Sequence, residues 1–182
     1  MSHEHCITST QNWVQRVVVG LNLCPFAKRE LAKNRVRYCV SNAREQDQLL
    51  GDLEAEFKRL DQQPEIETTL LIHPYVLEDF FLYNHFLALA NDLLVQLDLE
   101  GIYQLASFHP EYQFGGTDPE DAENYTNRSP FAMLHIIREE GLALAIENYP
   151  DVDLIPENNI ALLNDMGRDK LSDLLKECLA PK

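Results

Sequence analysis

Residues 68–74 read T-T-L-L-I-H-P, and this stretch decides the fold class of the chain. Its first five residues form a short, continuous apolar run rich in β-formers, which is typical of a strand covered on both faces. A second such strand is predicted over residues 102–108, and it also ends in His-Pro, at His109. A third strand is predicted over residues 36–40, where apolar residues alternate with Arg37 and Cys39, as in a half-exposed strand.

Helical patterns fill the segments between these strands. Apolar residues recur on one face over residues 45–60 and 78–97. Crossovers of this length favour parallel strands, although the alternation in 36–40 leaves the orientation of that strand open. The sequence therefore predicts one α/β domain over residues 1–182. We expect a small, largely parallel three-stranded sheet covered by helices, a helical C-terminal part and disorder over residues 1–8.

Composition and charge exclude some classes of function. The chain has 182 residues, 45% of them apolar and 25% charged, which is ordinary for a globular domain. Its formal charge of −15 opposes binding of nucleic acid, which rests on neutralising phosphates. No signal peptide and no membrane-spanning run is visible, and the four cysteines fit no zinc module. We therefore expect a cytoplasmic protein that binds neither membrane nor nucleic acid.

Two histidines follow the two apolar strands, in the repeated pattern strand-His-Pro. If these strands are parallel, His73 and His109 lie at the same edge of the sheet, where open α/β sheets usually bind ligands. Histidines there can transfer protons, bind a metal or hold an anion. The structural alternative is that each caps a strand end and forms hydrogen bonds with loop backbone.

About twenty residues without a helical or strand pattern follow, over 110–129. Compact domains seldom keep so long a loop unless it is functional or disordered. The loop ends at Ser129-Pro130, which predicts the start of a helix running to about residue 148. Arg128 and Ser129 would flank the positive end of that helix and form an anion site.

The same predicted helix would carry two further candidates on one face. His135 and Arg138 are three residues apart, which places them on the same side of a helix. Cys24 is the remaining candidate, because Pro25 predicts a short helix with this thiol near its N-terminus. A thiol in that position can be an activated nucleophile, whereas a small buried apolar residue is the structural alternative.

Three long motifs carry a resemblance to a known family. They are W-V-Q-R-V-V-V-G-L-N-L-C-P-F-A-K (residues 13–28), S-F-H-P-E-Y-Q-F-G-G-T (107–117) and N-Y-T-N-R-S-P-F-A-M-L-H-I-I-R-E (124–139). Together they resemble an uncharacterised family of bacterial proteins, a domain of unknown function, from about residue 13 to 160. The resemblance implies a single-domain bacterial protein, cytosolic and of unstated activity. It transfers no catalytic role to any residue.

These observations lead to one expectation of function and two alternatives. We expect an enzyme that acts on a small anionic metabolite at the carboxyl edge of the sheet, with the 110–129 loop closing the pocket. Proton transfer or nucleophilic attack would fall to His109, His73 and Cys24, and no metal ligand or cofactor is assigned. The proposed substrate contacts are Arg128, Arg138, Tyr112, Asn124, Ser129 and His135. The alternatives are a non-catalytic protein that binds a ligand or partner, and a metal-dependent hydrolase.

Overall fold

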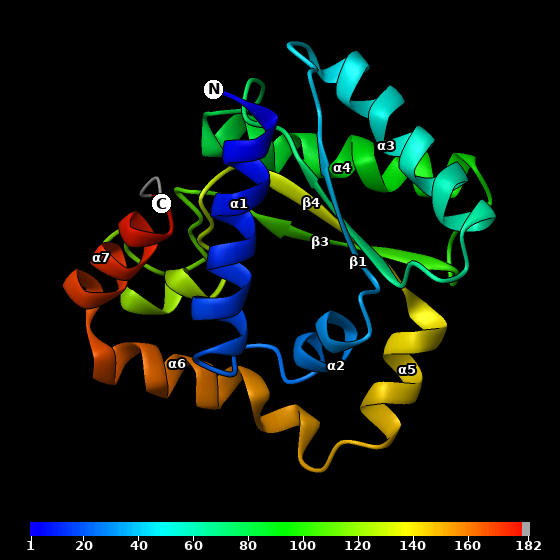
Figure 1. Cartoon of the computed structure of the whole chain (residues 1–182). Coiled ribbons are helices and arrows are strands. Elements are labelled where there is room, and N and C mark those ends of the chain that lie inside the picture. The colour runs from blue at the N-terminus through cyan, green and yellow to red at the C-terminus, as the bar shows by residue number, and fades with distance from the viewer. Residues whose placement is uncertain (180–182) are drawn as a thin grey trace.

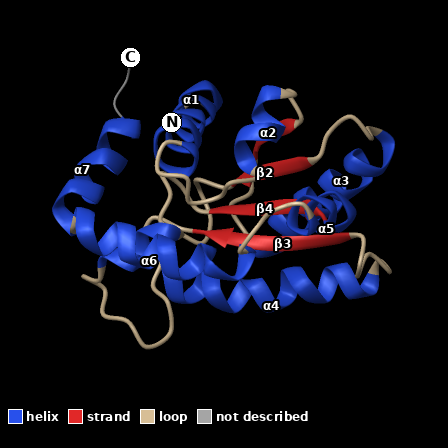
Figure 2. Cartoon of the chain, turned by 90° about the horizontal axis from the view of Figure 1, so that it is seen from below, coloured by secondary structure: helices blue, strands red, loops and turns tan. Residues whose placement is uncertain are grey.

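A four-stranded sheet organises the protein, and the computed structural model describes residues 1–179. Its strands are β1 (Val36–Val40), β2 (Thr68–Ile72), β3 (Tyr103–Phe108) and β4 (Met133–Arg138), in the order β1-β2-β4-β3 (Figure 1). β1 runs parallel to β2, whereas β4 is antiparallel to both of its neighbours. Figure 2 shows β4 between β2 and β3. The other three strands therefore share a direction, and their carboxyl ends lie at one edge.

The prediction of a largely parallel, three-stranded sheet was wrong in strand number and in direction. The missed strand is β4, which the pattern at Ser129-Pro130 places in a helix. Pairing on both sides supplies the backbone hydrogen bonds of β4 and buries its apolar side chains, and this overrides the local helix signal. The Ser129 hydroxyl donates to the carbonyl of Phe131 at 2.7 Å instead of capping a helix. Helix begins only at α5 (Glu139–Glu147).

The other strands and the two long helices lie where the sequence predicts them, with ends shifted by a few residues. The first strand is parallel to its neighbour. Helices α3 (Gln46–Gln62) and α4 (Phe80–Gln96) form the crossovers and cover one face of the sheet. The large side chains fully or almost fully buried on this face are Leu49, Leu53, Phe57, Leu60, Tyr83, Phe86 and Tyr103.

The opposite face is covered by helices from both ends of the chain. Helix α1 (His3–Trp13) continues into the π-helical η1 (Val14–Val19), and α2 (Ala27–Ala32) follows. The predicted disorder over residues 1–8 was wrong, because α1 begins at residue 3 and packs against the C-terminal helix α7. The helical C-terminal part is confirmed, with η3 (Val152–Leu154), α6 (Ile155–Met166) and α7 (Arg168–Leu179).

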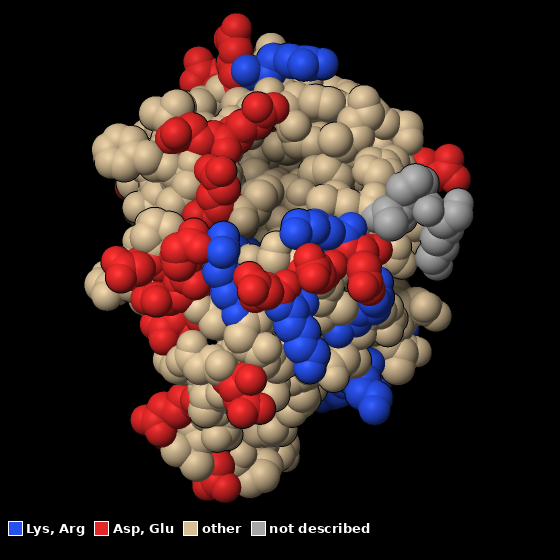
Figure 3. All heavy atoms as spheres, turned by 90° about the vertical axis from the view of Figure 1, so that its left-hand side faces the viewer, with Lys and Arg blue, Asp and Glu red and all other residues tan. Residues whose placement is uncertain are grey.

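Charged side chains of both signs cover the side of the molecule that carries α7. Figure 3 shows basic and acidic groups next to each other there, without a continuous basic field. The formal charge of the whole chain is −15. Among the helices of residues 1–179, none is both long enough and apolar enough to cross a bilayer.

Arg138, at the end of β4, ties the sheet to the turn between α3 and β2. Its guanidinium donates to the carbonyls of Leu60 and Ile66, the latter at 2.9 Å, and to the Tyr103 hydroxyl at 3.1 Å. The guanidinium also lies over the Tyr103 ring, with its carbon atom 5.4 Å from the ring centroid. Because these donors are used within the fold, Arg138 is a structural anchor.

We expect Arg138→Met to lower the free energy of unfolding by about 2–4 kcal/mol, because several partly buried acceptors lose a charged donor. Chemical denaturation measures this change. The control is Arg168→Met, which removes an exposed ion pair with Glu120 and should cost about 1 kcal/mol or less. Equal losses in the two variants would contradict the anchoring role.

Candidate functional site

The structure brings the two strand-end histidines together at the carboxyl edge of the sheet. His73 and His109 both pack against the Tyr83 ring, with centroid distances of 5.7 and 5.0 Å. The Tyr83 hydroxyl donates to the carbonyl of Met133 at 2.9 Å and accepts from the amide of Phe108 at 3.1 Å. The three rings therefore form one buried cluster that joins β2, β3, β4 and α4.

Both histidines are used to hold loop backbone, as in the structural alternative. The ring of His73 bonds to the carbonyl of Val76 through Nδ1 at 3.0 Å. His109 bonds to the carbonyl of Leu77 through Nε2 at 3.1 Å and accepts from the amide of Glu111 at Nδ1. Each residue is 1% exposed. Burial lowers the pKa of His73 to about 4 and also lowers the pKa of His109, so both rings are neutral at pH 7.

The 110–129 loop is ordered by its own polar side chains. Asn124, in the 3₁₀ turn η2 (Ala122–Thr126), is fully buried. Its Oδ1 accepts from the Phe114 amide at 2.9 Å and from the Thr117 hydroxyl at 2.8 Å, and its Nδ2 donates to the Asp118 carbonyl. All of these contacts are internal and the side chain is sealed from solvent, so Asn124 shapes the loop.

The remaining loop candidates are also engaged within the loop. Arg128 donates from Nε to the Tyr112 carbonyl at 3.1 Å and from Nη2 to the Pro119 carbonyl at 2.6 Å, and it stacks on Tyr125. The Tyr112 hydroxyl lies 3.3 Å from the hydroxyl of Ser107. Ser129 is fully buried. The helix N-terminus on which the predicted anion site depends is not formed here, because the chain continues into strand β4.

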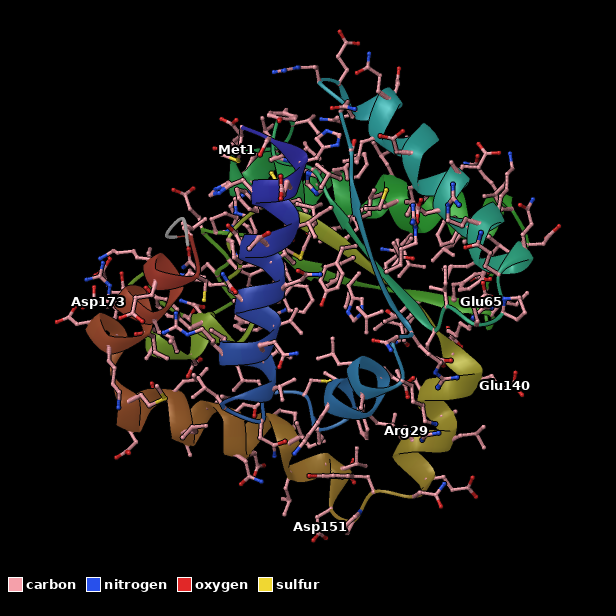
Figure 4. All side chains as sticks on the ribbon, in the orientation of Figure 1. Met1, Arg29, Glu65, Glu140, Asp151 and Asp173 are labelled. Atoms are coloured by element: carbon pink, nitrogen blue, oxygen red, sulfur yellow. The ribbon has the colours of Figure 1, made fainter. Side chains whose placement is uncertain are left out.

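Cys24 and His135 lie elsewhere, and both line an apolar cavity on the α1 face of the sheet. The cavity has a volume of about 240 Å³ and lies between the sheet and helices α1, α2 and α5. Figure 4 shows side chains projecting into the space between these elements, whereas the labelled Glu140 and Asp151 point outward. Every strand of the sheet contributes to the wall, through residues that alternate toward this face.

Most of the cavity wall is hydrocarbon. The ring of Trp13 packs edge-on against Phe108, with centroids 5.2 Å apart, and Phe108 lies 6.0 Å from the His135 ring. The indole Nε1 of Trp13 is buried without a hydrogen-bond partner, so this residue adds aromatic surface and no polar contact. The other apolar residues of the wall include Val14, Val18, Phe26, Leu31, Val36, Leu70, Ala106, Ile137, Leu142 and Ala145.

Few polar groups reach this wall. His135 forms a 2.6 Å hydrogen bond with Thr68, whose hydroxyl lies 2.6 Å from the carbonyl of Ile136. Burial lowers the pKa of His135 to about 4. Two carboxylates, Glu30 and Glu67, complete the polar part of the wall, and Arg35 bridges them with contacts of 2.7 and 3.1 Å.

The thiol of Cys24 lacks the environment of an activated nucleophile. Burial raises its pKa, and backbone N–H groups of Phe26 and Ala27 oppose that rise only in part. The residue precedes α2 by one turn and does not lie at its N-cap, which is Phe26. A thiol that is protonated at pH 7 is a poor nucleophile. Cys24 therefore serves the cavity as a small apolar wall residue.

The structure bears on metal binding as well. Within residues 1–179, no group of three or more His, Cys, Asp or Glu side chains could hold a metal ion. The metal-dependent hydrolase alternative thus lacks a set of ligands in this part of the chain.

Sequence reasoning missed the cavity because it depends on strand β4. In a helix, His135 and Arg138 share a face, but in a strand they point to opposite faces of the sheet. The signal was present in M-L-H-I-I-R, residues 133–138, where β-branched residues favour a strand. No functional role was predicted for Trp13, Thr68 or Phe108, because apolar and hydroxyl residues in regular elements usually belong to the core.

The buried imidazole of His73 should make stability fall in acid. Its pKa is about 4 in the folded protein and near 6.5 in the unfolded chain, so the unfolded chain takes up the proton first. The free energy of unfolding should therefore drop as pH falls below 6.5, by about 2 kcal/mol from this group by pH 5. In His73→Asn this part of the pH slope should vanish, and in the exposed control His85→Asn it should remain. Identical slopes would rule out a neutral, buried His73.

Labelling with iodoacetamide tests the state of Cys24. At pH 8 we expect Cys24 in the folded protein to react at least tenfold more slowly than in the denatured protein, because burial suppresses the thiolate. Peptide mapping separates it from the other three cysteines. Faster labelling in the folded protein would instead identify Cys24 as an activated nucleophile.

Comparison with known proteins places the chain in a family. A family model described as a protein of unknown function (DUF1415) matches residues 5–173, a span that contains all three long motifs and every residue of the cavity wall. A search of curated proteins and a search of solved structures found no match. Because the family model covers nearly the whole chain, this protein belongs to the family of proteins of unknown function DUF1415.

Proposed function

We propose that this protein binds a small, mainly apolar molecule in the cavity on the α1 face of the sheet. One observation carries the proposal: about 240 Å³ of space next to the sheet is lined mainly by hydrocarbon, with one histidine in its wall. Protein interiors are normally close-packed, so a space of this size is uncommon unless it receives a ligand. An apolar cavity of about 150 Å³ takes benzene, so a two-ring molecule suits this one.

The contacts around the two arginines give little support to the anionic metabolite expected from the sequence. Arg128 and Arg138 donate to backbone carbonyls and lie outside the cavity wall. Two carboxylates lie in that wall, and no lysine or arginine does among the residues described. An anion would therefore enter an apolar site without a cation to pair with it.

Ligand binding without catalysis is the better-supported alternative to an enzyme. Among the wall residues with catalytic potential, Cys24 and His135 are kept protonated and neutral, respectively, at pH 7 by burial. Neither is paired with a group that would activate it. All four cysteines are free thiols, which supports the cytoplasm as the compartment in which the protein binds its ligand.

Filling the cavity should abolish binding. Ala106 lies on β3 beside His135, and its side chain belongs to the cavity wall. We expect wild-type protein to bind the bicyclic hydrocarbon indane, and Ala106→Leu to lose this binding because the added methyl groups occupy the same space. Saturation-transfer NMR on indane measures binding. The free energy of unfolding of Ala106→Leu should fall by less than about 1 kcal/mol, since the new side chain enters free space.

The matched control is Ala161→Leu, at an exposed position of α6, which should bind indane like the wild type. Two results would refute the proposed function. One is a wild-type protein that does not bind indane, and the other is unchanged binding by Ala106→Leu.

A further inference from the structure

The hydrogen bonds of Thr68 fix which nitrogen of His135 carries the proton. The carbonyl oxygen of Ile136 can only accept, so the Thr68 hydroxyl donates its single proton there, across 2.6 Å. The same hydroxyl lies 2.6 Å from Nε2 of His135 and must act as the acceptor in that contact. Nε2 therefore carries a proton and donates it to Thr68.

The second nitrogen of His135 is left as a free acceptor. Since the ring is neutral and Nε2 is protonated, Nδ1 bears a lone pair. Nδ1 has no hydrogen-bond partner in the described part of the chain, and unlike Nε2 of His73 it is not fully buried. His135 lies between Leu70 of β2 and Ala106 of β3 in the wall of the cavity. Nδ1 is thus the polar atom that His135 offers there.

We propose that the ligand of this cavity carries a hydroxyl or N–H group that donates to Nδ1 of His135, and that it carries no negative charge. This inference rests on the proposed function of the cavity. It defines the ligand class as neutral, mainly apolar alcohols, phenols or amines with a free N–H. In this account Thr68 is a positioning residue, because it holds His135 in the tautomer that accepts.

The charges near the cavity favour the same class. Glu30 and Glu67 belong to the wall, and the cation that balances them, Arg35, does not. A carboxylate ligand would meet the lone pair of Nδ1 and two carboxylates in an apolar surrounding, where unpaired charge is strongly disfavoured. A neutral donor finds its acceptor, Nδ1 of His135, already in place, and its binding buries no charge.

Five matched compounds test the inference: indane, 4-indanol, 5-indanol, 5-methoxyindane and indane-5-carboxylate. The better-placed indanol should bind wild-type protein about fivefold more tightly than indane, as one neutral hydrogen bond provides. The methoxy compound, which cannot donate, should gain nothing over indane. The carboxylate should bind at least tenfold more weakly than the indanol. Isothermal titration calorimetry at pH 7 gives these affinities.

Three variants locate the effect. His135→Phe keeps a ring in the wall and should bind indane while losing the preference for indanol. Thr68→Val removes the hydroxyl that fixes the tautomer and should also lose the preference, whereas Thr68→Ser should keep it. Imidazole ¹⁵N NMR on the wild type should show Nε2 protonated, Nδ1 unprotonated and a shift of Nδ1 when indanol binds, which tests the inference even if a variant fails to fold.

The possible failures are distinguishable. If indane binds and indanol is not preferred, or if the carboxylate binds as tightly as the indanol, the inference is wrong and the proposed function stands. If Thr68→Val keeps the preference, Thr68 does not position His135. If none of the compounds binds, the proposed function fails, and the inference fails with it.

Discussion

Strand β4 fills the gap between β2 and β3, and its pairing with both is the constraint on which the rest of the structure depends. Because side chains alternate along a strand, β4 sends Leu134, Ile136 and Arg138 to one face and Met133, His135 and Ile137 to the other. Leu134 and Ile136 join the packed core under α3 and α4, and Arg138 bonds to the end of α3 and the turn after it. The second group faces the N-terminal helices, where packing is incomplete and the cavity remains. The two faces of this strand therefore look onto different layers, a close-packed one and one that contains the cavity.

The carboxyl edge of the sheet shows how order and function can be confused in a sequence. His73, His109, Asn124 and Arg128 are polar residues in a long loop or beside it, and such residues often form active sites. In this fold, each holds backbone that would otherwise lack hydrogen-bond partners. The polar residues of the 110–129 loop supply hydrogen bonds that the backbone of a regular element would provide.

Much of the fold could be predicted from local patterns, and the site could not. The strand patterns at residues 36–40, 68–72 and 102–108 and the helical spacing of α3 and α4 predicted three strands and their crossovers. These elements agree with their local propensities. Residues 133–138 follow a strong helix-start signal that competes with their own β-branched residues, and pairing with two neighbouring strands decides for a strand. The convergence of His73 with His109 followed from parallel strands, but their burial depends on how the loop packs. Cys24 and His135 meet only through the tertiary arrangement, which no spacing in the sequence reveals.

The state of residues 133–138 is the most direct test of this account, and NMR of the uniformly labelled protein can measure it. We expect Cα and Cβ chemical shifts of a β-strand over these six residues, with cross-strand contacts from His135 to both Leu70 and Ala106 and slow exchange of the β4 amide protons. Helical shifts and sequential contacts between residues three apart over the same segment would contradict the account. In that case His135 and Arg138 would lie on the same face of a helix, and neither the cavity nor the acceptor Nδ1 in its wall would exist.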